Sequence, residues 1–395
     1  MRVLCHAQHL SGVGHFVRMH AIAHGLAAAG HEVHLVDGGR PVPRPAAAGA
    51  VAPVLLAPLV RADGRVVAPG SHAPANAVLA ERARALAGAV ERLRPDVFLV
   101  DHYPFSKWEL EPEILAAAAA ARRCNPGVRV LCSLRDVVPR TRHEAAAGDG
   151  YEARVLERLH AQFDGVLVHA DPSFTRLEEH FGRAAELRVP IAYTGFVTVA
   201  PPSGPAPSEP TAVVSAGGGT RALPFLMAAI EACGRLPPAM RVAVFAGLAQ
   251  DGAELRTLGA AARDGRFELH PFSADFAGGL AASHLSVSRA GYNTTVELLQ
   301  ARVRAVVVPD PRMSDQGPRA RRLAARGLAT VVDGDPPSVD ALGAAIERAL
   351  AGPAPRHDLD LAGVAATVRL LEGLGTGSEA GWDSTPTSTL RSTPA

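Results

Sequence analysis

The sequence predicts an α/β protein of two doubly wound domains that face a cleft, and three observations support this prediction. The chain has 395 residues, which at roughly 150 residues per domain allows two or three domains. Short apolar runs alternate with Ala-rich, helix-periodic segments along the chain, as β-α-β units require. A proline-rich stretch at residues 200–210 interrupts this alternation and predicts a linker between the domains.

In the first domain, residues 1–199, short apolar runs predict the buried strands of a parallel sheet. These runs are Arg2–Ala7, Glu32–Asp37, Val97–Asp101, Val130–Leu134 and Gly165–His169. Segments with helical spacing predict helices between them, at Gly14–Ala29, Asn76–Arg94 and Glu152–Gln162. The apolar run Val51–Val60 predicts a further buried strand.

The second domain, residues 211–374, repeats the pattern. Its predicted strands are Thr211–Ser215, Arg241–Phe245, Phe267–His270, His284–Ser288, Arg304–Val308 and Ala329–Val332. The final helix, residues 361–374, either closes this domain or crosses back to the first one. Residues 375–395 are rich in Ser, Thr, Pro and Gly, which predicts a disordered tail.

Composition excludes several classes of protein. The net charge is +1, from 40 Lys and Arg against 39 Asp and Glu, so sequence-independent binding to nucleic acid is not expected. Arginine supplies nearly all of the basic residues, and Lys107 is the only lysine. No run approaches the ~18 apolar residues of a membrane span, and no secretion signal is evident, so we expect a cytoplasmic protein. The four cysteines and 16 histidines lack the spacing of a metal site, so we expect no metal.

A glycine-containing loop follows the first predicted strand and leads into a helix. Gly12 and Gly14 let the backbone approach an anion closely, and the start of a helix offers N–H groups to a phosphate. His15 lies in the first helical turn, where the helix dipole favours the neutral imidazole and makes it a candidate general base. The alternative is that the glycines only shape a tight turn and that His15 caps it.

A second functional alternative for this loop is a dinucleotide-binding site. Gly12-x-Gly14 is followed by Asp37 at the end of the second strand, near the spacing of a ribose-binding acid. Val17 occupies the place of the third glycine, and His15 would crowd a pyrophosphate over the turn. These departures disfavour a nicotinamide or flavin cofactor.

Two loops of the second half also have the composition of an anion site. The run Ser215–Thr220 is glycine-rich and lies between a strand and a helix. In the run Ser288–Glu297, Gly291 and Tyr292 offer backbone N–H groups to a diphosphate, while Glu297 can accept both hydroxyls of a ribose. Asp315 and Gln316 could bind sugar hydroxyls. Taken singly, each group also has a purely structural interpretation. Gly217–Gly219 fit a flexible turn, Glu297 fits a solvated helix face, and Asp315 and Gln316 fit an N-cap.

Three motifs make the sequence resemble a known family. Gln8–Arg18 fits QHL-x-G-x-GH-x-x-R, Cys132–Asp136 fits CS-x-RD, and Ser288–Thr294 fits S-x-AGYNT. With Glu297 and Asp315-Gln316, they resemble the MurG-like GT-B glycosyltransferases with a family 28 type C-terminal domain, and most closely a set of predicted bacterial glycosyltransferases. The resemblance covers nearly the whole ordered chain and implies the GT-B fold, in which two Rossmann-like domains face a cleft.

The resemblance also implies a reaction and a set of site residues. Enzymes of this class transfer N-acetylglucosamine from its UDP conjugate to an acceptor hydroxyl, so a UDP-sugar is the expected donor and no further cofactor is expected. His15 is then the catalytic-base candidate, Glu297 binds the ribose and Gln316 binds the donor sugar. The other expected substrate-binding residues are Gly12, Gly14, Arg18, Arg135, Gly217, Gly218, Gly219, Thr220, Arg289, Gly291, Tyr292, Asn293, Thr294 and Asp315. The paired glutamines of MurG appear here as Asp315-Gln316, which leaves the donor open between N-acetylglucosamine and a related hexose.

Further polar groups follow strands of the first domain. Asp101 and Asp136 are candidates either to orient His15 or to replace it as the base, with capping and ion pairing as the alternatives. Asp333-Gly334-Asp335 and Asp358-Leu359-Asp360 imitate the D-x-D metal motif, but their positions favour solvated turns.

The expected mechanism is inversion without a metal, in which a base deprotonates the acceptor and helix N-termini meet the charge of the departing UDP. Inversion is implied by the resemblance alone. The alternatives are a UDP-sugar 2-epimerase, a nucleotide-sugar hydrolase and a non-catalytic nucleotide-sugar binding protein. The acceptor stays open, and a contact of Val51–Val60 with a lipid-linked acceptor would add peripheral association with the inner face of the membrane.

Overall fold

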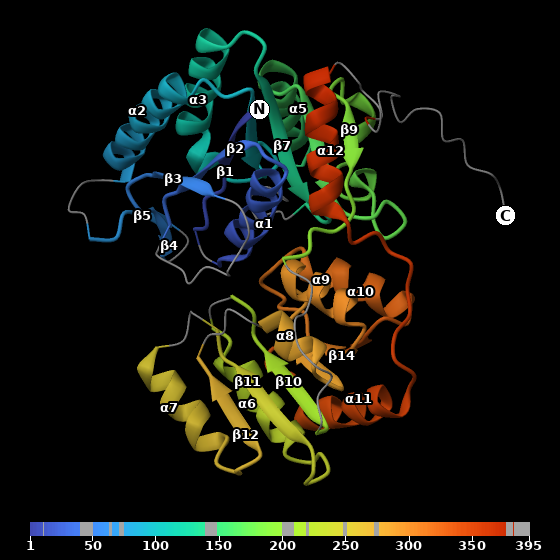
Figure 1. Ribbon diagram of the computed structural model, residues 1–395. Coiled ribbons are helices and arrows are strands. Elements are labelled where there is room, and N and C mark those ends of the chain that lie inside the picture. Colours follow the sequence, from blue (N-terminus) through green and yellow to red (C-terminus); the bar gives the residue numbers. More distant parts are fainter. Residues whose placement is uncertain are drawn as a thin grey trace, which may run out of the picture. The chain divides into compact units, whose positions relative to one another are not determined.

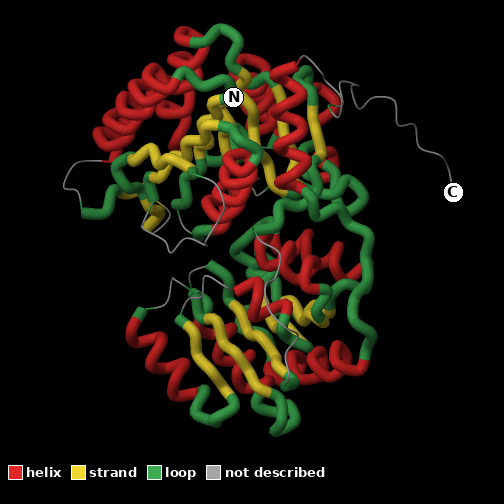
Figure 2. The backbone as a smooth tube through the Cα atoms, viewed as in Figure 1, coloured by secondary structure: helices red, strands yellow, loops and turns green. Residues whose placement is uncertain are grey.

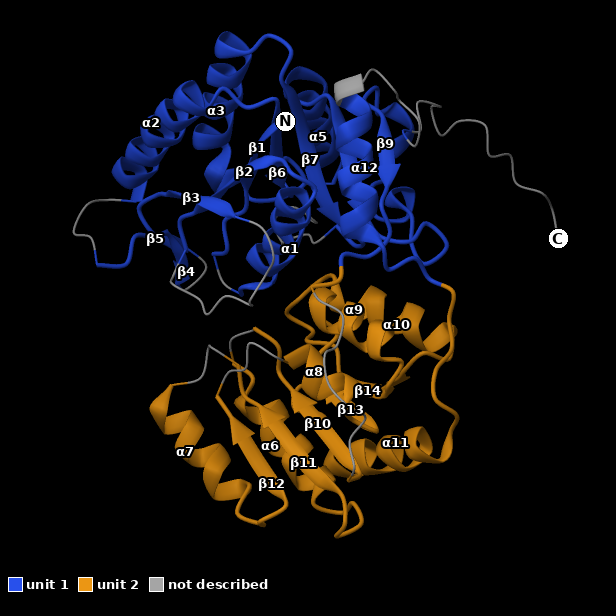
Figure 3. Ribbon diagram, viewed as in Figure 1, with its two compact units in different colours: residues 1–42, 46–197, 359–395 blue, residues 43–45, 198–358 orange. Residues whose placement is uncertain are grey.

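The computed structural model describes residues 1–10, 12–39, 50–62, 65–70, 75–138, 148–199, 209–218, 221–247, 251–271, 276–376 and 382. These residues form two compact α/β units (Figure 3). The first unit holds the described residues up to Val197 and from Leu359 onward, and the second holds those from Thr198 to Asp358. Each unit contains a parallel sheet flanked by helices (Figure 2), which confirms the two predicted doubly wound domains.

The sheet of the first unit has the strand order β3-β2-β1-β6-β7-β8-β9, and all neighbouring strands are parallel. Its strands are β1 (Arg2–His6), β2 (Glu32–Asp37), β3 (Val51–Leu55), β6 (Val97–Asp101), β7 (Arg129–Arg135), β8 (Gly165–His169) and β9 (Ile191–Tyr193). A separate antiparallel hairpin consists of β4 (Val60–Ala62) and β5 (Arg65–Val67). The central strands β6 and β8 are buried along their whole length, as strands covered on both faces should be.

Helices cover both faces of this sheet (Figure 1). They are α1 (Gly14–Ala28), α2 (Ala75–Leu93), α3 (Glu111–Cys124), α5 (Asp149–Gln162) and α12 (Gly363–Thr376), with short 3-10 turns η1 (Trp108–Leu110), η2 (Leu177–Glu179) and η3 (Ala184–Glu186). Val3 and Cys5 of β1 belong to a core cluster with residues of α1 and α12. His6, which points to the opposite face, contacts Glu113 of α3.

The second unit has a six-stranded parallel sheet with the order β12-β11-β10-β13-β14-β15. Its strands are β10 (Thr211–Ser215), β11 (Arg241–Phe245), β12 (Phe267–His270), β13 (Leu285–Ser288), β14 (Arg304–Val307) and β15 (Thr330–Val331). Its helices are α6 (Leu223–Cys233), α7 (Gly252–Ala261), α8 (Phe276–Ala281), α9 (Tyr292–Ala301), α10 (Gln316–Ala325) and α11 (Val339–Ala351). A core of its own fills the space between β10, β11, β13 and helices α6 and α11.

The two sheets share one topological feature that places their ligand sites. In the first unit the strand order reverses between β1 and β6, and in the second it reverses between β10 and β13. The loops that leave such neighbouring strands diverge to opposite faces, and open α/β sheets bind ligands in the crevice between them. The loops after β1, β6, β10 and β13 are therefore the expected binding loops.

The end of the chain returns to the first unit. The backbone of Val197 forms an antiparallel bridge with Ala362, and the Phe196 N–H donates to the Asp360 carbonyl at 2.8 Å. Helix α12 then packs along α1, and Trp382 is buried in the same core cluster. The predicted linker and tail lie almost entirely outside the described residues.

Several details differ from the sequence-based expectations. The strand β3 forms, but it lies at the edge of the sheet, and Leu55 is 73% exposed, so the prediction of a buried strand at Val51–Val60 was wrong. Helix α3, strand β9 and the hairpin of β4 and β5 were not predicted. Among the described residues, no helix has the length and apolar character needed to span a bilayer.

Candidate functional site

A histidine and an aspartate meet at the reversal point of the first sheet. His15 is the second residue of α1, directly after Gly14, and Asp101 is the last residue of β6. His15 Nδ1 lies 2.9 Å from Asp101 Oδ2. The aspartate side chain is fully buried, whereas 20% of the histidine side chain is exposed. The pair therefore has an inner carboxylate and an outer imidazole that a substrate can reach.

Asp101 is held by two further cations. Arg18, one turn after His15 on α1, donates from Nη2 to Asp101 Oδ1 at 2.5 Å, and Lys107 donates from Nζ to Asp101 Oδ2. Burial alone would raise the pKa of Asp101, but the positive charges of Lys107 and Arg18, together with the hydrogen bond to His15, outweigh it and hold this pKa well below 3.8. Asp101 is thus a carboxylate at any working pH.

The same surroundings keep His15 neutral. Burial and the positive charge of Lys107 lower the pKa of His15 to about 3, with a smaller effect of Arg135, although Asp101 acts in the opposite direction. Because Nδ1 faces Asp101, Nε2 is the ring nitrogen that can take a proton from a substrate. The geometry is that of a base oriented by a carboxylate.

His102 forms the wall beside His15. The two rings meet edge to face with centroids 4.8 Å apart. His102 Nε2 accepts hydrogen bonds from the backbone N and from Nε of Arg135, both at 3.2 Å. Burial and the nearby Arg135 hold the pKa of His102 well below 6.5, so this ring is neutral as well.

The ligating atoms of His15, Asp101 and His102 lie within 4.8 Å of one another, a grouping that could hold a metal ion. Both oxygens of Asp101 are already bound by cationic side chains, and His102 Nε2 already accepts from Arg135. This donor set does not fit a divalent cation, which needs available lone pairs and an excess of negative charge.

The structure places the other predicted residues of the first unit as follows. Asp136, the second candidate base, is 2% exposed and accepts a hydrogen bond from the Val137 N–H at 2.8 Å. Arg18 is fully buried beneath His15, and Arg135 is bound to His102. Gly12 and Gly14 flank the start of α1, where Val13 is the N-cap residue. Asp101 is therefore the carboxylate that lies against His15.

The second unit brings together two glycine loops, one after β10 at its own reversal point and one after the neighbouring strand β11. Gly217, after β10, has φ +67 and donates its N–H to Ser215 Oγ at 3.2 Å. A β-carbon on Gly247, after β11, would lie 2.3 Å from the Gly217 carbonyl oxygen, so this close approach requires glycine. Gly218 continues the loop, while Gly219 and Thr220 lie outside the described residues.

Helix α9 begins beside this loop. Gly291 is its N-cap residue and has no side chain to cap the helix, so the positive end of the helix dipole faces the strand end. Tyr292, Asn293 and Thr294 form the first turn, and Tyr292 and Thr294 are buried. This start of α9 can accept an anion, as predicted for a diphosphate.

Glu297 lies one turn further along α9. In the part of the chain that the structure describes, its carboxyl group has no hydrogen bond or ion pair. Burial raises its pKa from 4.5 to about 8. A carboxyl group in such surroundings gains by accepting hydrogen bonds from ligand hydroxyls.

Three other predicted residues of the second unit are engaged within the fold. Arg289 donates to Asp335 Oδ1 at 2.5 Å and lies over the Phe225 ring. Asp315 pairs with Arg319 at 2.9 Å. Gln316 Oε1 accepts from the Asp310 N–H at 2.9 Å and fixes the loop after β14. Asp335, in the first D-x-D sequence, lies in an exposed turn as expected, and its carboxylate, which is 17% exposed, binds Arg289 and lies near Arg312.

Lys107 is the site residue that the sequence did not indicate. It lies six residues after Asp101 and has no motif of its own. The signal that could have indicated it is its rarity, because Lys107 is the only lysine in an arginine-rich chain.

Two family models match the chain, one in each unit. The model of the glycosyltransferase family 28 C-terminal domain matches residues 215–356, and that of Glycosyltransferase Family 4 matches residues 13–196.

Among curated proteins, the chain is similar to the UDP-N-acetylglucosamine--N-acetylmuramyl-(pentapeptide) pyrophosphoryl-undecaprenol N-acetylglucosamine transferase of Phenylobacterium zucineum. The two are 33% identical over 174 residues. This match covers 42% of the chain and 46% of the relative, so it spans about half of the relative's length.

Solved structures resemble the whole chain. MurG of Acinetobacter baumannii has 18% sequence identity and a TM-score of 0.56, and the match covers 94% of this chain and 99% of that one. The spinosyn forosaminyltransferase SpnP has 16% identity and a TM-score of 0.59, with 96% and 95% covered. At these identities the likeness shows a common fold.

Proposed function

Since the chain is a MurG-like glycosyltransferase of the GT-B fold, as its sequence resemblance predicted, we propose that it transfers N-acetylglucosamine or a related hexose from a UDP-sugar to an acceptor hydroxyl. The observation that carries the proposal is the His15–Asp101 pair at the reversal point of the first sheet. A neutral imidazole held by a buried carboxylate is the arrangement that proton removal from a hydroxyl requires.

The proposed mechanism uses His15 as the general base. Nε2 takes the acceptor proton as the oxygen attacks the anomeric carbon, the bond to UDP breaks, and the configuration inverts. Asp101 orients the ring through Nδ1 and stabilises the imidazolium that forms. Asp101 keeps its own charge throughout, because two cationic side chains bind it.

Donor binding is assigned to the second unit. The start of α9 and the Gly217 loop would take the diphosphate, and Glu297 would accept hydrogen bonds from the ribose. Backbone N–H groups and the helix dipole would meet the charge of the departing UDP, so the proposal includes no metal and no further cofactor.

The acceptor is proposed to bind to the loops of the first unit. The curated relative acts on an undecaprenol-linked acceptor, as its name states. A polyprenyl-linked sugar is therefore the first acceptor class to test, and its use would place the protein in the cytoplasm at the inner face of the membrane.

The donor is tested by calorimetry and thermal shift with UDP, GDP, dTDP, NAD and their sugar conjugates, with and without EDTA. We expect stabilisation by UDP and UDP-N-acetylglucosamine that EDTA does not change. A response to dTDP or GDP sugars alone would overturn the donor, and a response to NAD alone would overturn the function. Release of UDP without a glycosylated product would indicate a hydrolase or an epimerase, which the comparisons do not favour.

The base is tested by His15→Gln. We expect kcat to fall about 10²- to 10⁴-fold, the usual contribution of a general base, with the Kd for UDP unchanged. The matched control is His24→Gln, the same change on the same helix at a residue that packs against His20. Full turnover of His15→Gln would remove His15 from the mechanism.

A further inference from the structure

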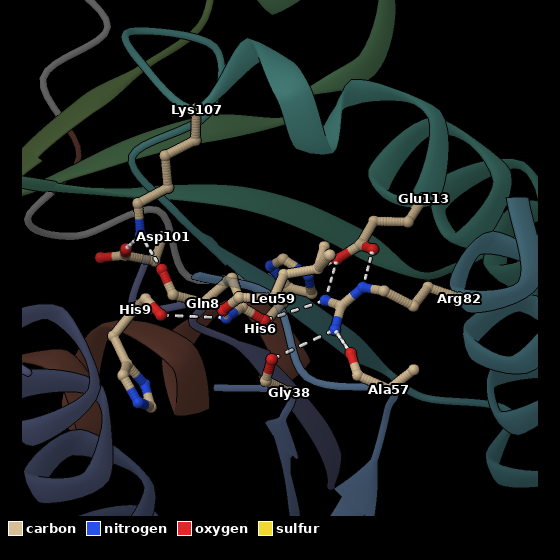
Figure 4. Close-up of polar contacts among 10 residues, drawn as sticks. All are labelled: His6, Gln8, His9, Gly38, Ala57, Leu59, Arg82, Asp101, Lys107 and Glu113. Carbon is tan, nitrogen blue, oxygen red and sulfur yellow. Dashed lines mark hydrogen bonds and ion pairs between the residues drawn. The ribbon is translucent and has the colours of Figure 1, made fainter. Parts of the chain in front are cut away.

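Lys107 joins the catalytic pair to the loop that carries it. Its Nζ donates to the Gln8 carbonyl oxygen at 2.8 Å and also to Asp101 Oδ2 (Figure 4). Only 10% of its side chain is exposed. One ammonium group therefore bridges the loop after β1 and the end of β6, the two segments that supply His15 and Asp101.

The backbone at Lys107 adds a second, independent observation. Its φ is +63, in the left-handed region that disfavours residues with a β-carbon. Glycine would adopt this conformation without strain. Glycine is common in this chain, which contains 38 of them, yet this position holds a lysine. Strain of this kind concentrates at functional sites, where the side chain itself is required.

The far end of the bridge is fixed by a buried ionic network (Figure 4). Arg82 of α2 donates to Gln8 Oε1 at 2.9 Å and binds both carboxylate oxygens of Glu113. His6 Nε2 contacts Glu113 Oε1 at 2.8 Å. Gln8 Nε2 donates to the carbonyls of His9 and Leu59. Gln8 is thus a rigid anchor, so the contact of Lys107 with its carbonyl limits the movement of the ammonium group.

The charges around Asp101 show what Lys107 contributes. Arg18 from α1 already balances the carboxylate, so Lys107 leaves an excess positive charge beside His15. Arg135 from β7 adds to this excess, and the neighbouring His102 is neutral. Positive charge disfavours protonation of an adjacent imidazole.

We propose that Lys107 is a positioning residue for the reaction: its ammonium group fixes the Asp101 carboxylate relative to the loop after β1 and keeps His15 in the unprotonated, proton-accepting form. This inference rests on the proposed role of His15 as the base. It adds a third member, the chain's only lysine, to the His15–Asp101 pair.

The test compares Lys107→Met, which removes the charge, with Lys107→Arg, which keeps it. For Lys107→Met we expect the donor KM to stay within about twofold, the plateau kcat to fall about tenfold, and the acidic limb of the pH profile to move up by about one pH unit. Lys107→Arg should leave the acidic limb of the pH profile at the pH of the natural protein and should retain part of the kcat that Lys107→Met loses. Arg122→Met is the control, because it removes a cation bound to Asp164, which directly precedes β8 and so lies at the opposite end of the parallel strands from Asp101.

A titration separates this inference from the proposed function. The imidazole resonance of His15, assigned by its loss in His15→Gln, is followed by NMR between pH 2 and pH 8. We expect its midpoint to rise in Lys107→Met, whether or not a sugar is transferred. An unchanged midpoint and an unchanged limb in folded Lys107→Met would overturn the inference. If Lys107→Met does not fold, Lys107→Gly removes the amine at a position where glycine suits the backbone, and the same criteria apply.

Discussion

Glu297 shows at the level of one residue how a ligand site costs stability. Its pKa is about 8 in the folded protein against 4.5 for an ordinary glutamate. Below pH 4.5 the group is neutral in both states and its burial has little effect. Between pH 4.5 and pH 8 only the unfolded chain ionises, so the folded state loses stability as the pH rises, and above pH 8 the loss is complete.

We therefore expect Glu297→Gln to be more stable than the natural protein at pH 8 and equal to it at pH 4, as measured by urea unfolding at both pH values. Its affinity for UDP, measured at pH 9 where the natural carboxyl group is ionised, should fall about tenfold or more, because a charge-assisted hydrogen bond to the ribose is lost. Glu231→Gln, an exposed acid on α6, is the control and should change neither quantity. A Glu297→Gln protein with unchanged UDP affinity would contradict the ribose assignment.

The residues of the candidate site differ in how far the sequence could predict them. His15 was predictable, because glycines before a helix mark a local turn that a single segment determines. Asp101 was one of two candidate carboxylates, because the sequence predicts which residues lie at the ends of strands but not which of their side chains points to His15. Lys107 could not be predicted, because its contacts depend on a left-handed residue and on Gln8, 99 positions earlier in the chain.

At the level of elements, the contact between α1 and α12 depends on one glycine. A β-carbon on Gly25 would lie 2.1 Å from Val364 Cγ1, so Gly25→Ala must displace the Val364 side chain or the helix that carries it. We expect the free energy of unfolding to fall by about 1–3 kcal/mol, as overpacked cores show. Thermal unfolding followed by circular dichroism measures this change.

The control is Gly88→Ala in α2, where the nearest atom to a new β-carbon is Arg92 Nη1 at 3.6 Å. The same substitution should raise stability there by about 0.5–1 kcal/mol, because glycine is unfavourable inside a helix. Equal effects of the two substitutions would show that α12 does not pack tightly on α1.

Most strands were predicted within one or two residues, because parallel strands buried on both faces are continuous apolar runs with polar ends. The exceptions have physical reasons. Strand β9 has only three residues, too few for a pattern, and β3 is apolar although nothing in the described chain covers Leu55. Helix α3 contains an uninterrupted run of alanines, so its sequence shows weak periodicity.

At the level of the whole molecule, the second unit is an insertion between Val197 and Leu359 of the first. It has its own sheet and its own hydrophobic core. We expect residues 209–358 alone to fold cooperatively and to bind UDP with a Kd within about threefold of that of the full chain. Circular dichroism and calorimetry test this, and the same fragment with Glu297→Gln is the binding control. A fragment that folds without binding UDP would place part of the donor site in the first unit.

The bridge between Val197 and Ala362 holds the two ends of the second unit side by side, so that recombination can exchange this unit as a whole. Recombination at the codons of these two residues, which are adjacent in the fold, replaces the whole second unit. The sheet, α12 and the His15–Asp101 pair of the first unit stay intact. Under the proposed division, in which the second unit binds the donor and the first unit the acceptor, a lineage can acquire a new donor-binding unit and keep the acceptor-binding unit it already has. The donor sugar and the acceptor can then change independently of each other during evolution.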